Sequence, residues 1–472
     1  MRAVTGRTLF DKLWDDHVVA DLGDGVALLH VDRHLLHDLG SGYAFRDLER
    51  RGFRLRNPEL HFATVDHVVS SEPGRTGGAA EWADRHIAAL REGCRRWGVR
   101  LADVTDARQG IVHVVAPELG ITQPGMLVVC GDSHTSTNGA LGALAWGIGT
   151  TELVHVMATQ TVLARRPKRM RVVFTGTPAR GVEPKDLALA LIARVGAGGG
   201  NGHAIEYAGE GVSAMTIDGR MTLCNLTIEL GGRIGVVAPD DRTFAYLEGR
   251  PFAPHGALWE RALDAWRALA SDADAVFDRE IGIDANAVKP QITWGTSPAD
   301  AIALDGTIPD PASCPDPAAR QAIVSALEYM GLAPGRPIAG TPIDRVFIGS
   351  CTNSRLSDLE RAAAVVAGRR VATGVEAWVV PGSQFVKRAA EARGLDRVFR
   401  DAGFEWREPG CSLCVGANGD IVEPGARCVS TSNRNFVGRQ GPGARTHLAS
   451  PTVAAACAIA GEIVGELPEG AR

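Results

Sequence analysis

Short apolar runs alternate with amphipathic segments along the chain. Most of the apolar runs end in Gly, Asp or Ser, as in "GMLVVCGD", "KRMRVVFTG", "IDRVFIGS" and "VEAWVVPG", and "GVALLHV" belongs to the same class. Such runs are typical of buried parallel strands that deliver loops at their ends. Helical periodicity fills the gaps, in "EWADRHIAALREGCRRWG", "PKDLALALIARVG", "LSDLERAAAVVAGR" and "SQFVKRAAEARG". This alternation predicts α/β layers with functional residues at strand ends.

Pro, Gly, Ser and Asp concentrate between Lys289 and Gln321, which marks the main domain boundary. With 472 residues the chain is too long for one ordinary core. We therefore predict α/β lobes over residues 1–288, a linker over 289–320 and a further α/β lobe over 321–472.

Composition and charge narrow the class of protein. A hydrophobic fraction of 45% and a charged fraction of 22% are those of a globular protein. The net charge of -5 argues against nucleic-acid binding, which needs a basic face. The start "MRAVTGRTLFDKLWDDHVV" has acids where a signal peptide is apolar, and no apolar run of about 20 residues follows. We expect a cytoplasmic protein with no membrane segment.

Three of the nine cysteines have the sequence context of metal ligands. Cys411 and Cys414 form a C-x2-C pair in "PGCSLC", and Cys351 follows an apparent strand in "GSCTNS". A structural zinc site needs four ligands, and a redox pair has no need of Cys351. Three thiolates suit a metal centre with one open position, either catalytic zinc or an iron-sulfur cube. The other six cysteines are expected to be structural.

Histidines beside aspartates form a second group of candidates. An adjacent carboxylate fixes the tautomer of an imidazole and raises its basicity, which prepares it for general acid chemistry. The candidates, each associated with an apolar run, are Asp66 and His67 in "TVDHVVS", His113 in "QGIVHVV", and Asp132, Ser133 and His134 in "GDSHTSTNG".

Two more segments carry candidate polar residues. "STSNRNFVGRQG" contains Asn433, Arg434 and Arg439, and its two guanidinium groups could each hold a carboxylate or could simply lie on the surface. In "MTLCNLTIELGG", Asn225 and Glu229 are four residues apart, which predicts that they share one helix face.

Together these motifs resemble the aconitase superfamily, and within it the family of isopropylmalate dehydratase large subunits. "TVDH", "QGIVH", "GDSHT", "MTLCN", "GSCTNS", "PGCSLC" and "STSNRNFVGRQG" occur in that family's order, and the resemblance covers nearly the whole chain. It implies an aconitase-like fold, with three α/β lobes around a central iron-sulfur cluster. It also implies that Cys351, Cys411 and Cys414 hold one 4Fe-4S cluster with one iron not ligated by protein.

The resemblance further implies a reaction and roles for the candidates. An alkylmalate, 2-isopropylmalate, would lose water to give 2-isopropylmaleate and regain it as 3-isopropylmalate, a step of leucine biosynthesis. His67, oriented by Asp66, would protonate the leaving hydroxyl. The residues expected to line the cluster pocket are His113, Asp132, Ser133, His134, Asn225, Glu229 and Asn433. Arg434 and Arg439 would bind substrate carboxylate.

A partner is also implied. Single-chain aconitases have a further domain with a serine base, and this chain ends at "GELPEGAR" without one. We therefore expect a small subunit of about 200 residues that carries the serine base and a substrate-specificity loop, in the size range of one domain.

Departures from the family pattern leave the substrate open. Gly40, Gly42 and Tyr43 replace the usual residues near the pocket wall, and "CVGANGD" departs from the common "CLAMNND". Benzylmalate, methylmalate or homocitrate are alternative substrates that would use the same catalytic residues.

Two other classes of function are weighed as well. A cluster-dependent RNA-binding regulator is disfavoured by the acidic balance. A nucleotide-binding loop at "VGAGGGNGH", next to His203, is disfavoured because the glycines follow an apparent helix and not a strand.

Overall fold

The computed structural model describes residues 6–469, which form two compact units. The first contains residues 6–68, 81–177 and 198–285. The second contains residues 69–80, 178–197 and 286–469. Within residues 6–469, no helix is both long enough and apolar enough to cross a membrane.

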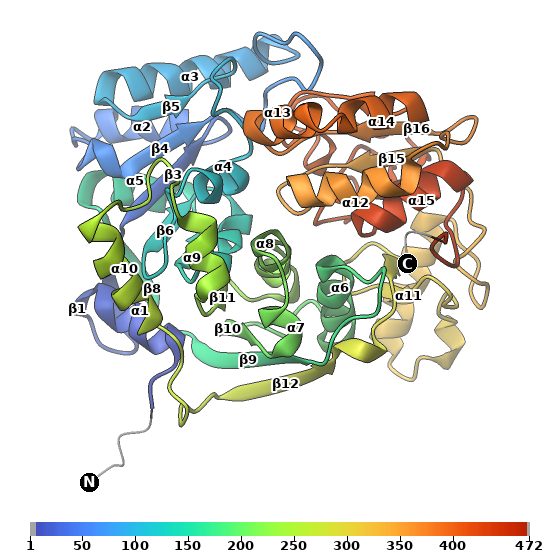
Figure 1. Cartoon of the computed structure of the whole chain (residues 1–472), viewed down its shortest axis with the longest axis horizontal. Coiled ribbons are helices and arrows are strands. Elements are labelled where there is room, and N and C mark those ends of the chain that lie inside the picture. Colours follow the sequence, from blue (N-terminus) through green and yellow to red (C-terminus); the bar gives the residue numbers. More distant parts are fainter. Residues whose placement is uncertain (1–5, 470–472) are drawn as a thin grey trace. The chain divides into compact units, whose positions relative to one another are not determined.

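Three sheets make up the first unit (Figure 1). A five-stranded parallel sheet has the order β5 (Arg100–Ala102), β4 (His61–Thr64), β3 (Arg33–His37), β6 (Leu127–Cys130), β7 (Leu144–Gly147). A four-stranded parallel sheet has the order β11 (Ile234–Val237), β10 (His203–Ala208), β9 (Lys168–Thr175), β12 (Arg279–Asp284). The third sheet is antiparallel, with the order β1 (Val18–Asp21), β2 (Val26–His30), β8 (Thr161–Arg165).

Helices of the first unit cover these sheets. The helices are α1 (Leu9–His17), α2 (Ser41–Arg50), α3 (Glu81–Trp97), α4 (Val112–Glu118), α5 (Thr150–Thr159), α7 (Glu210–Ser213), α8 (Ile217–Asn225), α9 (Asp241–Leu247) and α10 (Ala257–Arg267). Short 3-10 segments are η1 (Pro58–Leu60), η2 (Ser133–Leu141) and η3 (Leu226–Leu230). Helix α2 packs against α3 and α5, and one apolar cluster joins α4 to strands β3, β4 and β6. The core therefore holds α4 beside the strands whose ends carry the candidate residues.

The second unit is built on one five-stranded parallel sheet. Its order is β17 (Glu405–Trp406), β16 (Glu376–Val379), β15 (Arg345–Ile348), β18 (Arg427–Ser430), β19 (Arg445–Leu448), and β13 (Gln291–Thr293) with β14 (Ala301–Ala303) forms a separate antiparallel pair. The helices are α6 (Pro184–Val195), α11 (Pro317–Met330), α12 (Leu356–Val366), α13 (Gln384–Ala392), α14 (Leu395–Ala402) and α15 (Pro451–Ala460), with 3-10 segments η5 (Pro311–Ser313) and η6 (Ser412–Cys414). Helix α12 packs against α13, α14 and α15, drawn in orange and red in Figure 1.

Mixed helices and parallel sheets confirm the predicted α/β class. Each of the three parallel sheets with its helices forms an α/β layer, two of them in the first unit and one in the second. All four segments with helical periodicity are helices, α3, α6, α12 and α13. Four of the five apolar runs are parallel strands, β6, β9, β15 and β16.

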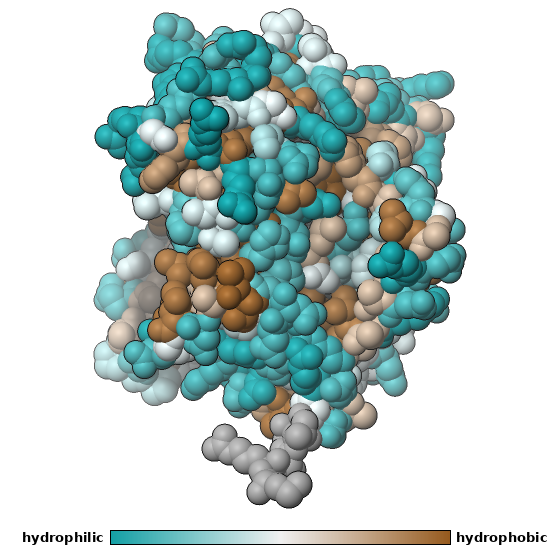
Figure 2. Space-filling view, turned by 90° about the vertical axis from the view of Figure 1, so that its left-hand side faces the viewer, coloured by the Kyte–Doolittle hydropathy of each residue, from teal (hydrophilic) through white to brown (hydrophobic). Residues whose placement is uncertain are grey.

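The run "GVALLHV" differs from its prediction. It forms β2, which pairs antiparallel with β1 and β8 and alternates between buried and half-buried positions. The other face of this sheet is exposed, and Val19, Leu22 and Leu163 are about half accessible to solvent. Figure 2 shows apolar surface on the side of the chain that carries β1. A run of four consecutive apolar positions thus arises here from a strand that fully buries only one face.

The division of the chain also differs from the predicted ranges. The boundary after Ala285 falls in the 3-10 helix η4 (Ala285–Ala287), but residues 69–80 and 178–197 pack with the second unit. The segment expected to be a linker contains β13 and β14. Helix α6 joins this region because buried Asp186 accepts a hydrogen bond from the backbone N–H of Gln291 at 2.8 Å.

Candidate functional site

Neighbouring strands of the first unit end in charged side chains. Strands β4, β3 and β6 are adjacent and parallel, so their carboxyl ends lie at the same edge of the sheet. Asp66 and His67 follow β4, and Asp132 follows β6. The sheet therefore brings together residues that are 66 positions apart in the sequence.

His67 lies between two carboxylates. Its Nδ1 is 2.6 Å from Asp66 Oδ1, and its Nε2 is 3.1 Å from Asp132 Oδ2. Asp66 is itself held by the backbone N–H of Val112, which donates to Oδ2 at 2.9 Å. Each ring nitrogen of His67 thus faces a carboxylate oxygen, which suits the doubly protonated imidazolium.

The two carboxylates also set the charge of His67. Burial alone would lower the pKa of this imidazole, but the charges and hydrogen bonds of Asp66 and Asp132 raise the pKa well above its usual value of 6.5. Burial acts on Asp132 in the opposite sense, and hydrogen bonds from His113, His134 and His67 hold its pKa well below 3.8. His67 is therefore a cation at neutral pH, and it can donate a proton.

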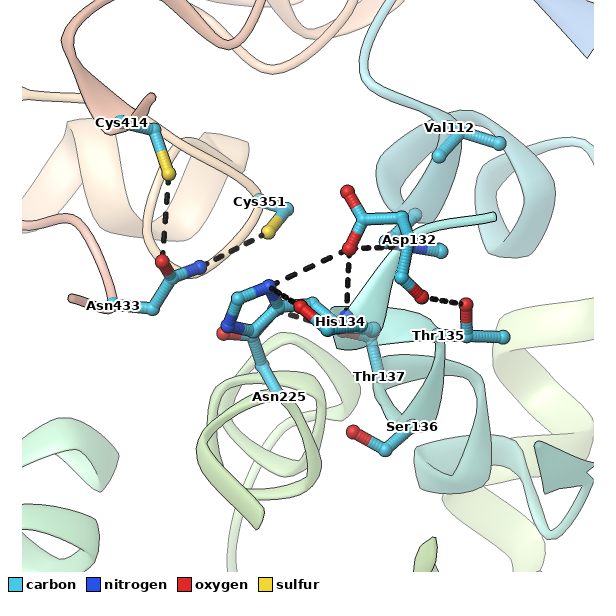
Figure 3. Close-up of polar contacts among 12 residues, drawn as sticks. Val112, Asp132, His134, Thr135, Ser136, Thr137, Asn225, Cys351, Cys414 and Asn433 are labelled. Carbon is cyan, nitrogen blue, oxygen red and sulfur yellow. Dashed lines mark hydrogen bonds and ion pairs between the residues drawn. The ribbon is translucent and has the colours of Figure 1, made fainter. Parts of the chain in front are cut away.

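Asp132 lies beside two further histidines. Oδ1 of Asp132 accepts from the backbone N–H of His134 at 2.6 Å and is 3.5 Å from the ring nitrogens His134 Nδ1 and His113 Nε2. His113 is the second residue of α4, so its apolar run "QGIVHVV" leads into a helix. Figure 3 shows His134 turned toward the carboxylate of Asp132.

Glu229 and Asn225 extend this network by different contacts. Glu229 Oε1 is 2.8 Å from His134 Nε2, and Asn225 Nδ2 donates to Thr137 Oγ1 at 2.8 Å. The prediction that they share one helix face is wrong, because α8 ends at Asn225 and Glu229 lies in the 3-10 segment η3. Ser133 Oγ lies 3.4 Å from His134 Nδ1.

The three candidate cysteines converge in the second unit. Cys351 follows β15. Cys411 directly precedes the single turn η6 and Cys414 ends it, and Cys414 N donates to Cys411 O at 3.0 Å. One carboxamide contacts two of the sulfurs, with Asn433 Nδ2 at 3.4 Å from Cys351 Sγ and Asn433 Oδ1 at 3.5 Å from Cys414 Sγ (Figure 3). All three cysteines are buried, and none of them forms a disulfide within the described residues.

The backbone beside these cysteines is strained. Ser350 and Ser412 adopt φ values of +75° and +47°, in the left-handed region that serine rarely occupies. Such strain persists only where the surrounding structure enforces it, and it clusters at functional sites.

The two arginines of "STSNRNFVGRQG" are half-buried in the second unit. Arg439 Nε donates to the carbonyl oxygen of Cys414 at 2.9 Å, which leaves the terminal nitrogens of its guanidinium for other contacts. Arg355 makes a similar bond, from Nη2 to the carbonyl of Cys351 at 2.9 Å. Cationic side chains thus hold the backbone of the cysteine loops.

Comparison with known proteins identifies the family of the chain. A family model described as "Aconitase family (aconitate hydratase)" matches residues 11–461. The chain belongs to the aconitase family.

Relatives in this family cover almost the full chain. The protein named "3-isopropylmalate dehydratase large subunit 1" of Bradyrhizobium diazoefficiens is 60% identical over 458 residues, 97% of this chain and 96% of the relative. The "3-isopropylmalate dehydratase large subunit" of Roseiflexus castenholzii is 54% identical over 462 residues, 97% of this chain and 98% of the relative. A crystal structure of Thermococcus kodakaraensis aconitase X in its holo-form covers 90% of this chain and 89% of its own, with 11% identity and a TM-score of 0.45.

A single metal ion sets a limit on the spacing of its ligand atoms. Two sulfurs on one zinc ion lie at most about 4.6 Å apart, twice the Zn–S distance of about 2.3 Å. Among residues 6–469, the one group of three or more metal-ligating side chains whose ligand atoms all lie within 4.8 Å of one another contains no cysteine. Within the described residues, the three cysteines therefore do not form such a closely spaced group.

That closely spaced group, His37, Asp38, Asp66 and His67, includes two residues that the sequence analysis missed. Asp38 accepts from the backbone N–H groups of His67 and Val68 at 3.0 and 2.9 Å, so its carboxylate shapes the loop. His37 stacks on His67 with ring centroids 4.3 Å apart. Burial and the nearby charge of His67 lower the pKa of His37 to about 4, so it is neutral. The pair "HD" follows the two leucines of "RHLLHD", and this position was the available signal.

Lys185 was also missed. This residue of α6 is fully buried, and its Nζ donates to the carbonyl oxygen of Ser432 at 2.6 Å, next to Asn433. Burial lowers the pKa of Lys185 to about 7, although nearby anionic groups oppose the shift. Nothing in the amphipathic pattern of α6 distinguishes this lysine from one that faces solvent.

Proposed function

We propose that the chain is the large, catalytic subunit of a 3-isopropylmalate dehydratase, an iron-sulfur hydro-lyase of leucine biosynthesis. Its reaction interconverts 2-isopropylmalate and 3-isopropylmalate through dehydration to 2-isopropylmaleate and rehydration. The observation that carries this proposal is the 60% identity, over 97% of the chain, to a protein of that name.

The thiols of Cys351, Cys411 and Cys414 would hold a 4Fe-4S cluster with one iron not ligated by protein. When bound, such a cluster supplies a Lewis acid for the hydroxyl and carboxylate of the substrate. The burial of these three cysteines in one unit, outside any disulfide of the described residues, supports this assignment. Asn433 keeps Cys351 and Cys414 apart because its carboxamide lies between their sulfurs.

His67 is the proton donor for the leaving hydroxyl. Dehydration breaks a C–O bond, and the departing oxygen must gain a proton to leave as water. The high pKa of His67 keeps Nδ1 and Nε2 protonated at neutral pH, and Asp66 and Asp132 fix the ring. Rehydration reverses the transfer, so His67 then accepts the proton from water.

The remaining polar residues of the first unit position this chemistry. Asp132 orients His67, and together with His113, Ser133 and His134 it would hydrogen-bond the reacting oxygen. Glu229 fixes the ring of His134 through Nε2. Asn225 acts through Thr137, whose hydroxyl donates to the carbonyl of His134 at 2.6 Å.

Carboxylate binding falls to Arg434 and Arg439. A guanidinium group can bind a carboxylate through two parallel hydrogen bonds. Arg439 is anchored at Nε by the carbonyl of Cys414, so its outer edge remains available for such a pair. Asn433, the residue before Arg434, is fully buried and would lie beside the cluster.

A second subunit completes the enzyme in this proposal. Both curated relatives are named as large subunits, which supports a small-subunit partner. We assign to that partner, of about 200 residues, the serine base that removes the carbon-bound proton and the loop that reads the substituent on C3.

A substrate panel tests the proposed function. The chain is co-expressed with candidate small subunits under anaerobic conditions, and turnover is measured on 2-isopropylmalate, benzylmalate, methylmalate and homocitrate. We expect 2-isopropylmalate to give the highest kcat/KM and the variant His67→Gln to lose it. A preference for another 2-alkylmalate would keep the reaction class but overturn the substrate, and activity of His67→Gln equal to wild type would overturn the mechanism.

A further inference from the structure

A cavity of about 430 Å³ lies in the first unit, among residues to which the proposed reaction gives no role. Its wall includes Trp14, Arg165, His203 and Arg233. His203 is the first residue of β10 and Arg233 precedes β11, so the cavity lies at the amino ends of these parallel strands. His67 and Asp132, in contrast, follow the carboxyl ends of their strands. The cavity is therefore distinct from the His–Asp network.

The charged lining of this cavity is entirely basic. Arg165, Arg166, His203 and Arg233 line it, and no Asp or Glu does. Asp11 and Asp15 neutralise Arg166, at 2.7 Å each. Arg165 and Arg233 instead donate to backbone carbonyls, of Asp24 and of Gly147, and within residues 6–469 neither forms an ion pair with a carboxylate. Two solvent-exposed guanidinium groups without a carboxylate partner among the described residues thus border the cavity.

Apolar side chains complete the lining. Trp14, Trp146, Ala164, Pro167 and Ile234 contribute to the same wall. The turn of the "GAGGGNG" segment adds Asn201 and Gly202, and the ring of His203 is held by a bond from Nδ1 to the carbonyl of Asn201 at 2.8 Å. A volume in the range of small-molecule sites, with an apolar wall and a few charged groups at its edge, is typical of a ligand pocket.

One contact connects the cavity to the His–Asp network. Arg233 Nη2 donates to Gly147 O at 2.9 Å, at the end of β7. Gly147 packs directly against the backbone of Asp132 and Ser133. A Cβ atom on Gly147 would lie 2.5 Å from Asp132 O and 2.9 Å from Ser133 Cα. A ligand that draws the guanidinium of Arg233 toward itself would therefore shift the backbone that carries Asp132.

We propose that this cavity binds a small organic anion with an apolar body, and that its occupancy adjusts the position of Asp132. Guanidinium forks bind carboxylate and phosphate alike. Two kinds of ligand share this chemistry, a nucleoside monophosphate and a dicarboxylate of the alkylmalate type. The binding site rests on the cavity alone, whereas its effect on turnover rests on the proposed function.

Binding is tested by titration calorimetry on the intact chain with three separate probes, AMP, 2-isopropylmalate and inorganic phosphate. We expect one organic probe to bind at the cavity and to lose at least tenfold in affinity in both Arg165→Gln and Arg233→Gln. Arg95→Gln on α3, which pairs with Glu92 on the surface, is the matched control and should bind as wild type. Because 2-isopropylmalate can also bind at the catalytic residues, its binding to the cavity is taken as the difference in binding between wild type and the cavity variants.

Several outcomes would overturn the proposal. The first is that neither organic probe shows binding that depends on the cavity residues. The second is that inorganic phosphate binds with the same affinity as the organic probes. The third is that the cavity variants bind the probe as wild type does, while their melting temperatures show that they are folded. A second readout tests the link to Asp132, namely the pH profile of kcat/KM with and without the bound effector. When the ligand of the cavity is added, we expect the basic limb of the kcat/KM profile to shift in wild type and to stay unchanged in Arg233→Gln. An unmoved limb in wild type would refute the link even where binding is seen.

Discussion

Asp132 raises the pKa of His67 and so favours its charged form. The variant Asp132→Asn keeps the shape of the side chain but removes the negative charge beside His67 Nε2. In the proposed mechanism His67 acts as an acid, so activity is expected below its pKa and is expected to be lost as pH rises through that pKa. Without Asp132 the pKa falls, so we expect the basic limb of kcat/KM to move to lower pH and activity to fall by roughly 10²- to 10⁴-fold.

Asp278→Asn is the control for that measurement. Asp278 pairs with Arg169 away from the His–Asp network, and its variant should keep both the rate and the pH profile. An Asp132→Asn enzyme with an unchanged basic limb would show that Asp132 does not set the pKa of His67.

His447 makes stability depend on pH in the second unit. Its ring is fully buried between Arg427 Nη1 and the carbonyl of Thr293, and burial with the charge of Arg427 lowers its pKa to about 3. The unfolded chain binds a proton here below pH 6.5, and the folded chain does not. The free energy of unfolding should therefore decrease as the pH is lowered from about 6 to about 4, by about 1.4 kcal/mol per pH unit for this group.

Urea unfolding of His447→Gln checks this slope. Glutamine does not titrate, so the variant should lose stability less steeply than wild type over that range. A slope equal to that of wild type would show that His447 does not carry the proton uptake.

For single residues, the sequence predicts which side chains are candidates for the site better than it predicts which of them are in contact. Adjacent residues such as Asp66 and His67 can be paired in advance, and the bond between their side chains is observed. The contact of Glu229 with His134 depends on the end of α8 and on packing across 95 residues, which no local pattern encodes. The same reason hides the bond from Lys185 to Ser432.

Among the elements, η2 is held closely against β11. A Cβ atom on Gly139 would lie 1.8 Å from the carbonyl oxygen of Gly235. Gly139→Ala must therefore push η2 outward, and η2 begins beside Asp132. We expect a loss of roughly 1–3 kcal/mol in stability, as for other overpacked sites, together with reduced turnover.

Gly282→Ala in β12 is the matched control, because a Cβ there meets nothing within 4 Å. Thermal unfolding of both variants gives the comparison. Equal melting temperatures would contradict the close approach of η2 to β11.

The periodicity of apolar residues predicts whether a segment is a helix or a strand, but it does not predict which strands pair with one another. The runs that form β6, β9, β15 and β16 could be predicted because buried parallel strands are continuously apolar or nearly so. The run that forms β2 has similar composition, and its antiparallel pairing with β1 and β8 depends on strands that local patterns did not identify.

At the scale of the whole chain, each of the two units is built from separate stretches of the sequence. Residues 69–80 and 178–197 belong to the second unit although the first unit surrounds them in sequence. Composition located the boundary near residue 288 because turn residues accumulate there. It could not reveal the inserted segments, whose membership is decided by buried bonds such as that from Asn418 Nδ2 to Val69 O at 3.1 Å.

The proposed small subunit gives a further prediction at this scale. The purified chain alone should show no turnover of 2-isopropylmalate, because the proposed serine base is on the partner. Activity should rise on titration with the small subunit and saturate at a fixed ratio. Full turnover by the chain alone would contradict this division of labour.

The central claim is that three cysteines of this chain hold an iron-sulfur cluster. Anaerobic quantification of iron and sulfide, with an electronic spectrum, tests it on wild type, Cys351→Ser, Cys411→Ser and Cys414→Ser. Cys94→Ser is the control, because Cys94 is a buried residue of α3. The account predicts about four irons and four sulfides per chain in wild type and in the control, and their loss in the three variants. Zinc in wild type, or a cluster that persists in all three variants, would contradict it.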